Sequence, residues 1–172
     1  MIVIINGSLG VGKTTVADHL YQKFDKSVHL DGDTIADVHP RDIYDDARVD
    51  HLYRTIELLI GFHHQYGYHN FVINYVFETP GSLEQLMALL RPLDADIHVF
   101  WLTCDKNTQA KRIQGRNRSQ IDWELNRFLE LQQIQARGAE QGFIGKQIDT
   151  TQMTSEETAG VIWKDLFPHT AA

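Results

Sequence analysis

The chain has 172 residues, which is enough for one domain with a substantial core and short for two. Its 16 basic and 23 acidic residues give a net charge of −7, which argues against nucleic acid as a partner. The single cysteine, Cys104, excludes an internal disulfide and is typical of a reducing compartment. No apolar run approaches membrane-spanning length, and the apolar start is too short for a signal peptide. We therefore expect one cytoplasmic domain (1–172), monomeric or homodimeric, that acts on a small substrate away from membranes.

The segment 7–14 reads Gly-Ser-Leu-Gly-Val-Gly-Lys-Thr and follows a short apolar run at 2–5. This is the pattern G-x-x-x-x-G-K-T between a predicted strand and a helix that begins at Lys13, the context of a phosphate-binding loop. The glycines let backbone NH groups turn toward a triphosphate, and the helix N-terminus adds partial positive charge.

In this motif Lys13 reaches the outer phosphates, and the Thr14 hydroxyl is a ligand for magnesium. The predicted nucleotide-binding residues of the loop are Gly7, Ser8, Leu9, Gly10, Val11, Gly12, Lys13, Thr14 and Thr15. The alternative is a glycine-rich turn that binds no ligand.

Apolar strands and amphipathic helices alternate along the chain, which is typical of an α/β fold with a parallel sheet covered on both faces. The predicted strands are 2–5, 27–31, 71–77, 97–102 and 147–150. The predicted helices run from 13 to about 24, from 49 to about 64, from 82 to about 91, across the arginines that follow the fourth strand, from 119 to about 132, and from 154 to about 166. Side-chain capping boxes are predicted at Ser82 with Gln85, Ser119 with Asp122, and Thr154 with Glu157.

The second predicted strand ends in Asp31-Gly32-Asp33. A carboxylate within hydrogen-bond reach of an alcohol orients it and accepts its proton, so Asp33 is the candidate base and Asp31 the runner-up. An ordinary turn with solvated acids is the alternative, because Asp and Gly favour turns. The acidic stretch 34–46 that follows is predicted to be an irregular surface lobe.

Two classes that share the phosphate-binding loop are separated by other segments. Regulatory GTPases need an aspartate-x-x-glycine segment after the third strand and an asparagine-lysine-x-aspartate segment for guanine, and the sequence contains neither. The third predicted strand also lacks the terminal aspartate that holds magnesium in many ATPases. Asp31 and Asp33 offer carboxylates in its stead.

These motifs resemble the small-molecule kinases of the adenylate-kinase-like P-loop superfamily, such as shikimate, gluconate, adenylylsulfate and chloramphenicol kinases and AAA-type kinases. The resemblance spans nearly the whole chain, through segments 7–14, 29–33, 112–118 and 148–151. It implies a three-layer P-loop NTPase fold with a five-stranded parallel sheet in the order 2-3-1-4-5. It also implies transfer of the γ-phosphate of ATP to a hydroxyl of a small metabolite or antibiotic, with ATP and magnesium as cofactors.

The resemblance implies roles for individual residues. Asp33 would lie beside the acceptor hydroxyl, and Asp31 would hold magnesium through water together with Thr14. A short lid at about 112–120 would bring Arg112, Arg116 and Arg118 to ATP, with Arg116 as the catalytic one beside Lys13, and Thr151 would lie near the adenine.

The insert at about 34–67 occupies the position where such kinases bind the acceptor. The candidate acceptor-binding residues, besides Asp33, are Arg41, Tyr44, Arg48, Tyr53, Tyr75 and Glu78. The few arginines argue against a highly phosphorylated acceptor, which usually takes an arginine clamp. Two other functions stay open, a nucleoside or nucleotide kinase and a nucleotide-binding switch without transferase activity.

Overall fold

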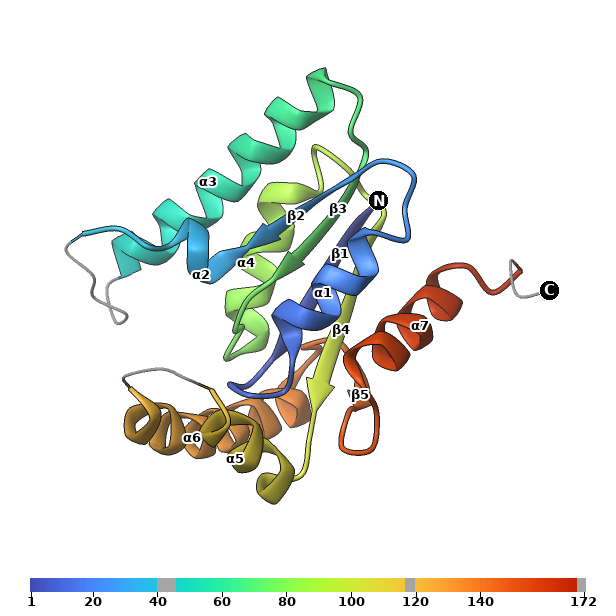
Figure 1. Cartoon of the computed structure of the whole chain (residues 1–172). Coiled ribbons are helices and arrows are strands. Elements are labelled where there is room, and N and C mark those ends of the chain that lie inside the picture. Colours follow the sequence, from blue (N-terminus) through green and yellow to red (C-terminus); the bar gives the residue numbers. More distant parts are fainter. Residues whose placement is uncertain (40–45, 117–119, 170–172) are drawn as a thin grey trace.

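The computed structural model describes residues 1–39, 46–116 and 120–169. Its core is a five-stranded parallel sheet in the order β2-β3-β1-β4-β5, which confirms the predicted fold class and strand order (Figure 1). The strands are β1 (Ile2–Gly7), β2 (Ser27–Asp31), β3 (Asn70–Asn74), β4 (Ile97–Thr103) and β5 (Lys146–Asp149).

Helices cover both faces of the sheet (Figure 1). They are α1 (Lys13–Tyr21), α2 (Gly32–Ile35), α3 (Asp46–Gln65), α4 (Pro80–Leu90), α5 (Lys106–Gln114), α6 (Ile121–Gln141) and α7 (Ser155–Leu166). Successive side chains of a strand point to opposite faces, so Ile2 and Ile4 of β1 pack with α3 and α4, whereas Val3 and Ile5 pack with α1 and α7. Every residue of β1 is buried, because a central parallel strand has no solvent-facing side.

The parallel register brings the carboxyl ends of the strands to one edge of the sheet. Asp31 of β2 lies opposite Asn74 of β3, and Asn74 lies opposite Ile5 of β1, directly before the glycine-rich loop. Open α/β sheets bind ligands outside this edge, where neighbouring connections run to opposite faces. The chain therefore brings its acidic pair and its glycine-rich loop to the same place.

Several predicted element boundaries were wrong. The third strand ends at Asn74 and not near Phe77, and the first helix ends at Tyr21 and not near Phe24. The capping box of α4 joins Thr79 and Ser82, with Pro80 in the first turn, and does not involve Gln85. Pro80 suits that position because it lacks the NH that a first turn leaves unpaired.

The later helices differ in their ends as well. The helix after the fourth strand ends at Gln114, so Arg116 lies beyond it. Helix α6 begins at Ile121 without a side-chain cap, whereas the predicted capping box of Thr154 with Glu157 on α7 is confirmed. The Ser119 side of the α6 cap falls outside the described residues.

Most of the predicted insert 34–67 is helix α3, and this helix belongs to the core. Its residues Leu52, Ile56 and Ile60 are fully buried against the sheet. Gly32–Ile35 form the helical turn α2, with the Asp31 carboxylate as its cap. The part of the chain that the structure describes contains no helix apolar and long enough to cross a membrane.

Candidate active site

The glycine-rich loop joins β1 to α1 and leaves its backbone free to surround an anion. Gly10 and Gly12 adopt φ angles of 81° and 98°, which side-chain-bearing residues rarely do. At Gly10 a Cβ would also lie 2.7 Å from the Ile113 side chain, so bulk is excluded there. The loop ends at the N-terminus of α1, whose unpaired NH groups and partial positive charge favour a phosphate.

A hollow of about 570 Å³ opens over this loop. Its lining residues come from the loop, from the first turn of α1, from the end of β2 with α2, and from the segment after α5. They are Leu9, Gly10, Gly12, Lys13, Thr14, Thr15, Asp31, Asp33, Thr34, Asp37 and Arg116. Lys13, Asp33 and Arg116, predicted to be catalytic, thus face one hollow, which we call the phosphate hollow. Gly7 ends β1, and Ser8 and Val11 are buried behind the loop.

Lys13 is 9% exposed, and its Nζ donates to the Ser8 carbonyl oxygen at 3.0 Å. Burial lowers the pKa of Lys13 to about 8, although the charges of Asp33 and Asp31 act to raise it. The charge of Arg116 lowers it further. A bound anion would supply the counter-charge that this lysine and Arg116 share.

Asp31 is held by several hydrogen bonds. Its Oδ2 accepts from the Thr14 hydroxyl at 3.1 Å and from Asn74 Nδ2 at 2.9 Å, and its Oδ1 accepts from the Thr34 backbone NH at 3.0 Å. Burial alone would raise the pKa of Asp31, but the hydrogen bonds from Asn74, Thr34 and Thr14 and the nearby His29 outweigh it, so the net shift is downward. The group is therefore an anion at neutral pH.

The orientation of the Asn74 side chain is fixed by its contact with His29. Its Oδ1 contacts His29 Nε2, and His29 Nδ1 lies 3.0 Å from an Asp18 carboxylate oxygen. Asn74 is the last residue of β3, the place where the sequence lacks an aspartate. Its role in holding Asp31 was missed, although its position at the end of an apolar strand was a usable signal.

A hydroxyl and a carboxylate, Thr14 and Asp31, are thus in direct contact beside the loop. These oxygen donors fit magnesium, which is usually bound by one or two protein oxygens together with phosphates and water. The described residues contain no group of three or more histidine, cysteine or acidic side chains that would hold a metal without a nucleotide.

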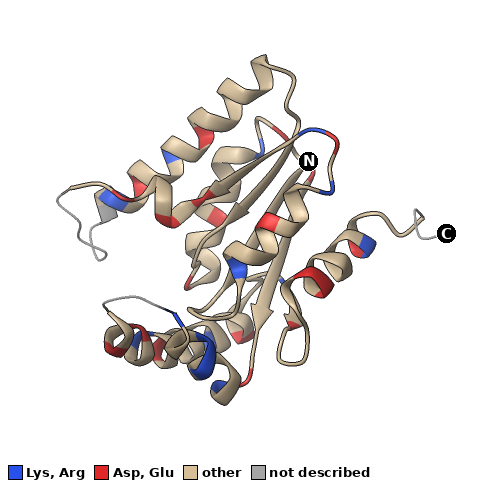
Figure 2. Cartoon of the chain, viewed as in Figure 1, with Lys and Arg blue, Asp and Glu red and all other residues tan. Residues whose placement is uncertain are grey.

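The arginines predicted to form a lid differ in their contacts. Arg116 forms an ion pair with the buried Glu124 at 3.1 Å and lines the phosphate hollow. Arg112 donates to the Thr150 carbonyl at 2.9 Å and to its hydroxyl at 3.1 Å, so it ties α5 to the loop after β5. Figure 2 shows that basic positions gather along α5 and the segment after it. Arg118 lies outside the described residues.

A second hollow of about 320 Å³ continues from the loop toward α7. Arg112 and Arg116 line it together with Thr150 and Met153. The predicted adenine neighbour, Thr151, instead bonds Asp149 at 2.6 Å and accepts from the Asp105 NH at 3.0 Å. Thr150, which belongs to the predicted segment 148–151, lines this second hollow.

The predicted acceptor residues lie on α3 and just beyond β3. Tyr53 packs in the core against Phe77, with ring centroids 6.1 Å apart, and Arg48 is buried at the start of α3. Tyr75 packs so closely over Gly32 that a Cβ there would lie 2.5 Å from its ring. Arg41 and Tyr44 lie outside the described residues.

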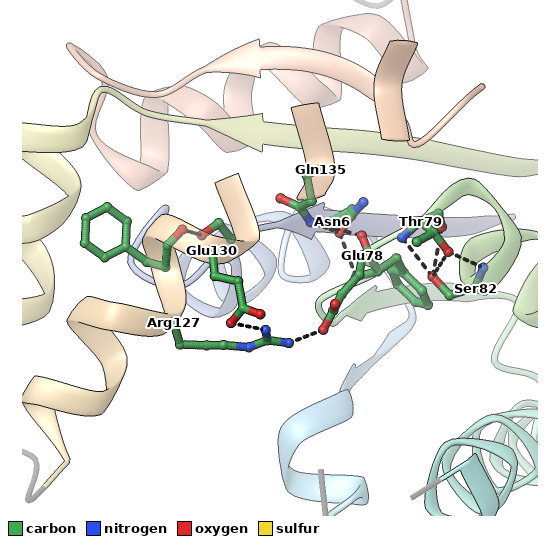
Figure 3. A network of polar contacts seen from close by, with 10 residues as sticks. Asn6, Glu78, Thr79, Ser82, Arg127, Glu130 and Gln135 are labelled. Carbon is green, nitrogen blue, oxygen red and sulfur yellow. Dashed lines mark hydrogen bonds and ion pairs between the residues drawn. The ribbon is translucent and has the colours of Figure 1, made fainter. Parts of the chain in front are cut away.

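Glu78 is part of a polar network that connects β1, the segment after β3, and α6 (Figure 3). It is ion-paired with Arg127 of α6. Beside this pair, Asn6 Oδ1 accepts from Gln135 at 3.1 Å, from the Phe77 NH at 2.9 Å and from the Gly7 NH at 2.7 Å. Glu78 therefore has a partner within the protein, and its contact with an acceptor stays a prediction.

A parallel sheet of this order with a phosphate-binding loop after its central strand defines a P-loop nucleoside-triphosphatase fold of the kinase-like type. Residues 2–139 match the family described as AAA domain, so the chain belongs to that family.

Solved structures with similar folds agree with this class. They include a tunicamycin resistance protein from Deinococcus radiodurans, with 18% identity, 96% of this chain and 95% of that one covered, and a TM-score of 0.67. A shikimate kinase from Acinetobacter baumannii shows 16% identity, coverage of 99% and 95%, and a TM-score of 0.64. A sugar kinase from Janibacter sp. shows 17% identity, coverage of 99% and 98%, and a TM-score of 0.65. No curated protein sequence matched the chain.

Proposed function

We propose that this protein is an ATP-dependent phosphotransferase that moves the γ-phosphate of ATP to a hydroxyl of a small acceptor. The observation that carries the proposal is that Lys13, Asp33 and Arg116 line the same hollow over the phosphate-binding loop. The positive charges of Lys13 and Arg116 can bind the phosphates of a triphosphate. The exposed carboxylate of Asp33 in the same hollow can accept a hydrogen bond from an alcohol. The kinases among the structural neighbours, which share the fold, support the same class.

In this mechanism the protein supplies charge and alignment. An acceptor oxygen forms a bond to the γ-phosphorus as the bond to the β,γ-bridging oxygen breaks, and ADP leaves. Asp33 orients the acceptor hydroxyl and takes its proton. Lys13, Arg116 and the loop NH groups hold the phosphate oxygens while negative charge shifts among them.

Thr14 and Asp31 are the residues that would hold magnesium. The metal, when bound with ATP, neutralises phosphate charge and fixes the phosphate chain. Asn74 keeps the Asp31 carboxylate turned toward Thr14, since Asn74 Nδ2 bonds both Asp31 and the Thr14 hydroxyl, at 2.9 and 3.3 Å. The lid of 112–120 and the acceptor-binding insert of 34–67 belong to the same proposal.

The test is a screen of alcohols, sugars, hydroxy acids and nucleosides for stimulation of ADP release from ATP and magnesium. We expect one chemical class to raise ADP release well above the rate without acceptor, with a phosphorylated product in equal amount. Nucleotide binding without stimulation by any acceptor would instead favour a nucleotide-binding switch. Stimulation by nucleosides or nucleoside monophosphates alone would favour a nucleotide kinase.

A further inference from the structure

Arg48 is a buried cation with an unused hydrogen-bond donor. Its side chain starts from the first turns of α3 and is 7% exposed. Among the described residues, its Nε is the one buried side-chain nitrogen or oxygen atom without a hydrogen-bond partner. The ion pairs between described residues, which engage Arg54, Arg91, Arg116 and Arg127, do not include it.

Arg48 lies close to Tyr75, whose ring packs at the end of β2 beside the proposed base. Burial raises the pKa of Tyr75, while a hydrogen bond from Arg48 and the charge of its guanidinium act to lower it. Asp33 and Glu78 are close enough to act on the same hydroxyl electrostatically. The Tyr75 ring lies directly over Gly32, next to Asp33 in the chain. Tyr75 thus connects the buried guanidinium to the proposed base.

A buried charge without a counter-charge is costly, and removing an arginine from water is tolerated when an anion pairs with it. Glu78 is not that anion, because Arg127 engages it. The guanidinium has a planar edge that matches a carboxylate through two parallel hydrogen bonds, and the Nε forms half of one such edge. Within the described part of the chain, the Nε donor is therefore left without an acceptor, beside the Tyr75 hydroxyl.

We propose that Arg48 binds a carboxylate of the acceptor, so that the acceptor is a small hydroxy acid with its carboxylate at Arg48 and its hydroxyl at Asp33. The hydroxyl half of this statement rests on the proposed phosphotransfer. A carboxylate is favoured over a phosphate ester because one arginine beside an acidic residue makes a poor clamp for a dianion. Arg48 is a specificity-determining residue in this arrangement.

The first test asks whether Arg48 serves the fold or a ligand. Arg48→Met keeps the apolar stem and removes the charge, and Arg54→Met on the exposed face of α3 is the matched control. We expect the melting temperature of the unliganded Arg48→Met protein to equal or exceed that of the wild type, because removing an uncompensated buried charge relieves a cost. A clear fall in melting temperature, or failure to fold, would show a structural arginine and overturn the proposal.

The second test measures binding without nucleotide. Hydroxy acids of about four to seven carbons, each paired with its own primary amide, are titrated by calorimetry into the wild type and both variants. We expect at least one acid to bind about 10- to 100-fold more tightly than its amide, as is typical of a hydrogen-bonded charge, and Arg48→Met alone to abolish the difference.

Equal binding of acid and amide, an acid preference that survives in Arg48→Met, or no binding by any acid would overturn the proposal. Arg48-dependent binding of phosphate monoesters in place of the acids would overturn it too. The assay of ADP release separates the two proposals. Binding of acids through Arg48 without any stimulation of ADP release would contradict only the proposed phosphotransfer. Equal phosphorylation of acids and neutral alcohols would contradict only the proposed carboxylate site.

Discussion

The nucleotide side and the proposed acceptor side of the molecule differ in how their buried polar groups are paired. Around the loop, Lys13 bonds the Ser8 carbonyl, the Ser8 hydroxyl donates to the Phe128 carbonyl at 3.2 Å, and Gln109 donates to Ser8 at 3.0 Å. On the acceptor side the buried Arg48 keeps a donor without a partner among the described residues. The buried polar groups around the loop are thus paired within the protein, whereas the proposed acceptor side keeps an unpaired donor among the described residues.

The largest expected effect is that of a substitution at Asp33, which should impair the proposed acceptor side and leave the nucleotide side intact. Asp33→Asn keeps the side-chain shape and removes its charge, so we expect turnover with the acceptor to fall about a hundredfold to ten-thousandfold. Nucleotide affinity should change little, because the loop and Lys13 are untouched. Steady-state kinetics and nucleotide titration check this, with the exposed Asp50→Asn as control. Phosphate transfer at the wild-type rate by the variant would contradict the role of Asp33 as the base and leave it as a residue of the helical turn α2.

Lys13→Ala should impair nucleotide binding, and turnover with it. The charge contacts phosphate before and during transfer, so we expect weaker ATP binding and turnover lower by about a hundredfold to a thousandfold, the typical effect of losing one such electrostatic group. Lys23→Ala, an exposed lysine beyond α1, is the control. Wild-type affinity and rate in Lys13→Ala would contradict the assignment of the phosphate-binding loop.

Arg116 shares the phosphate hollow with Asp33 of the proposed acceptor side and also lines the second hollow, so it tests whether the two sides act together. Arg116→Gln can still donate to Glu124, and we expect turnover to fall about 10- to 100-fold, as for a lost hydrogen bond to a charged group, with a smaller change in ATP affinity. The exposed Lys111→Gln is the control. An unchanged rate would make Arg116 a structural partner of Glu124.

The smallest effect concerns pH. Burial lowers the pKa of Lys13 to about 8, below its ordinary 10.5, so the folded protein binds fewer protons than the unfolded chain between these values and stability linked to Lys13 rises with pH in that window. A phosphate favours the charged lysine, so ATP binding near pH 8 should take up about half a proton and weaken as pH rises further. Calorimetry in buffers of different ionisation enthalpy measures this uptake, and Lys13→Met should lack it.

The fold and the nucleotide side could largely be predicted from sequence, whereas most of the acceptor side could not. Strand alternation and one local motif define the sheet and the loop, because glycine conformations and a helix start depend on neighbours in the chain. The contact of Asn74 with Asp31 depends on strand register over 43 positions. The burial of Arg48 depends on how α3 packs, and nothing in its local sequence distinguishes it from the exposed Arg54.

The carboxamide of Asn6 has a consequence for the order in which the chain folds. It joins β1 to Phe77, Gln135 and the carbonyl of Ile144, which lie 71, 129 and 138 positions away. Bringing such distant segments together costs loop-closure entropy before their contacts can stabilise the chain, so these contacts form late in folding. Asn6→Ala should therefore speed unfolding while leaving the refolding rate nearly unchanged, which makes this side chain a determinant of how long the native state persists.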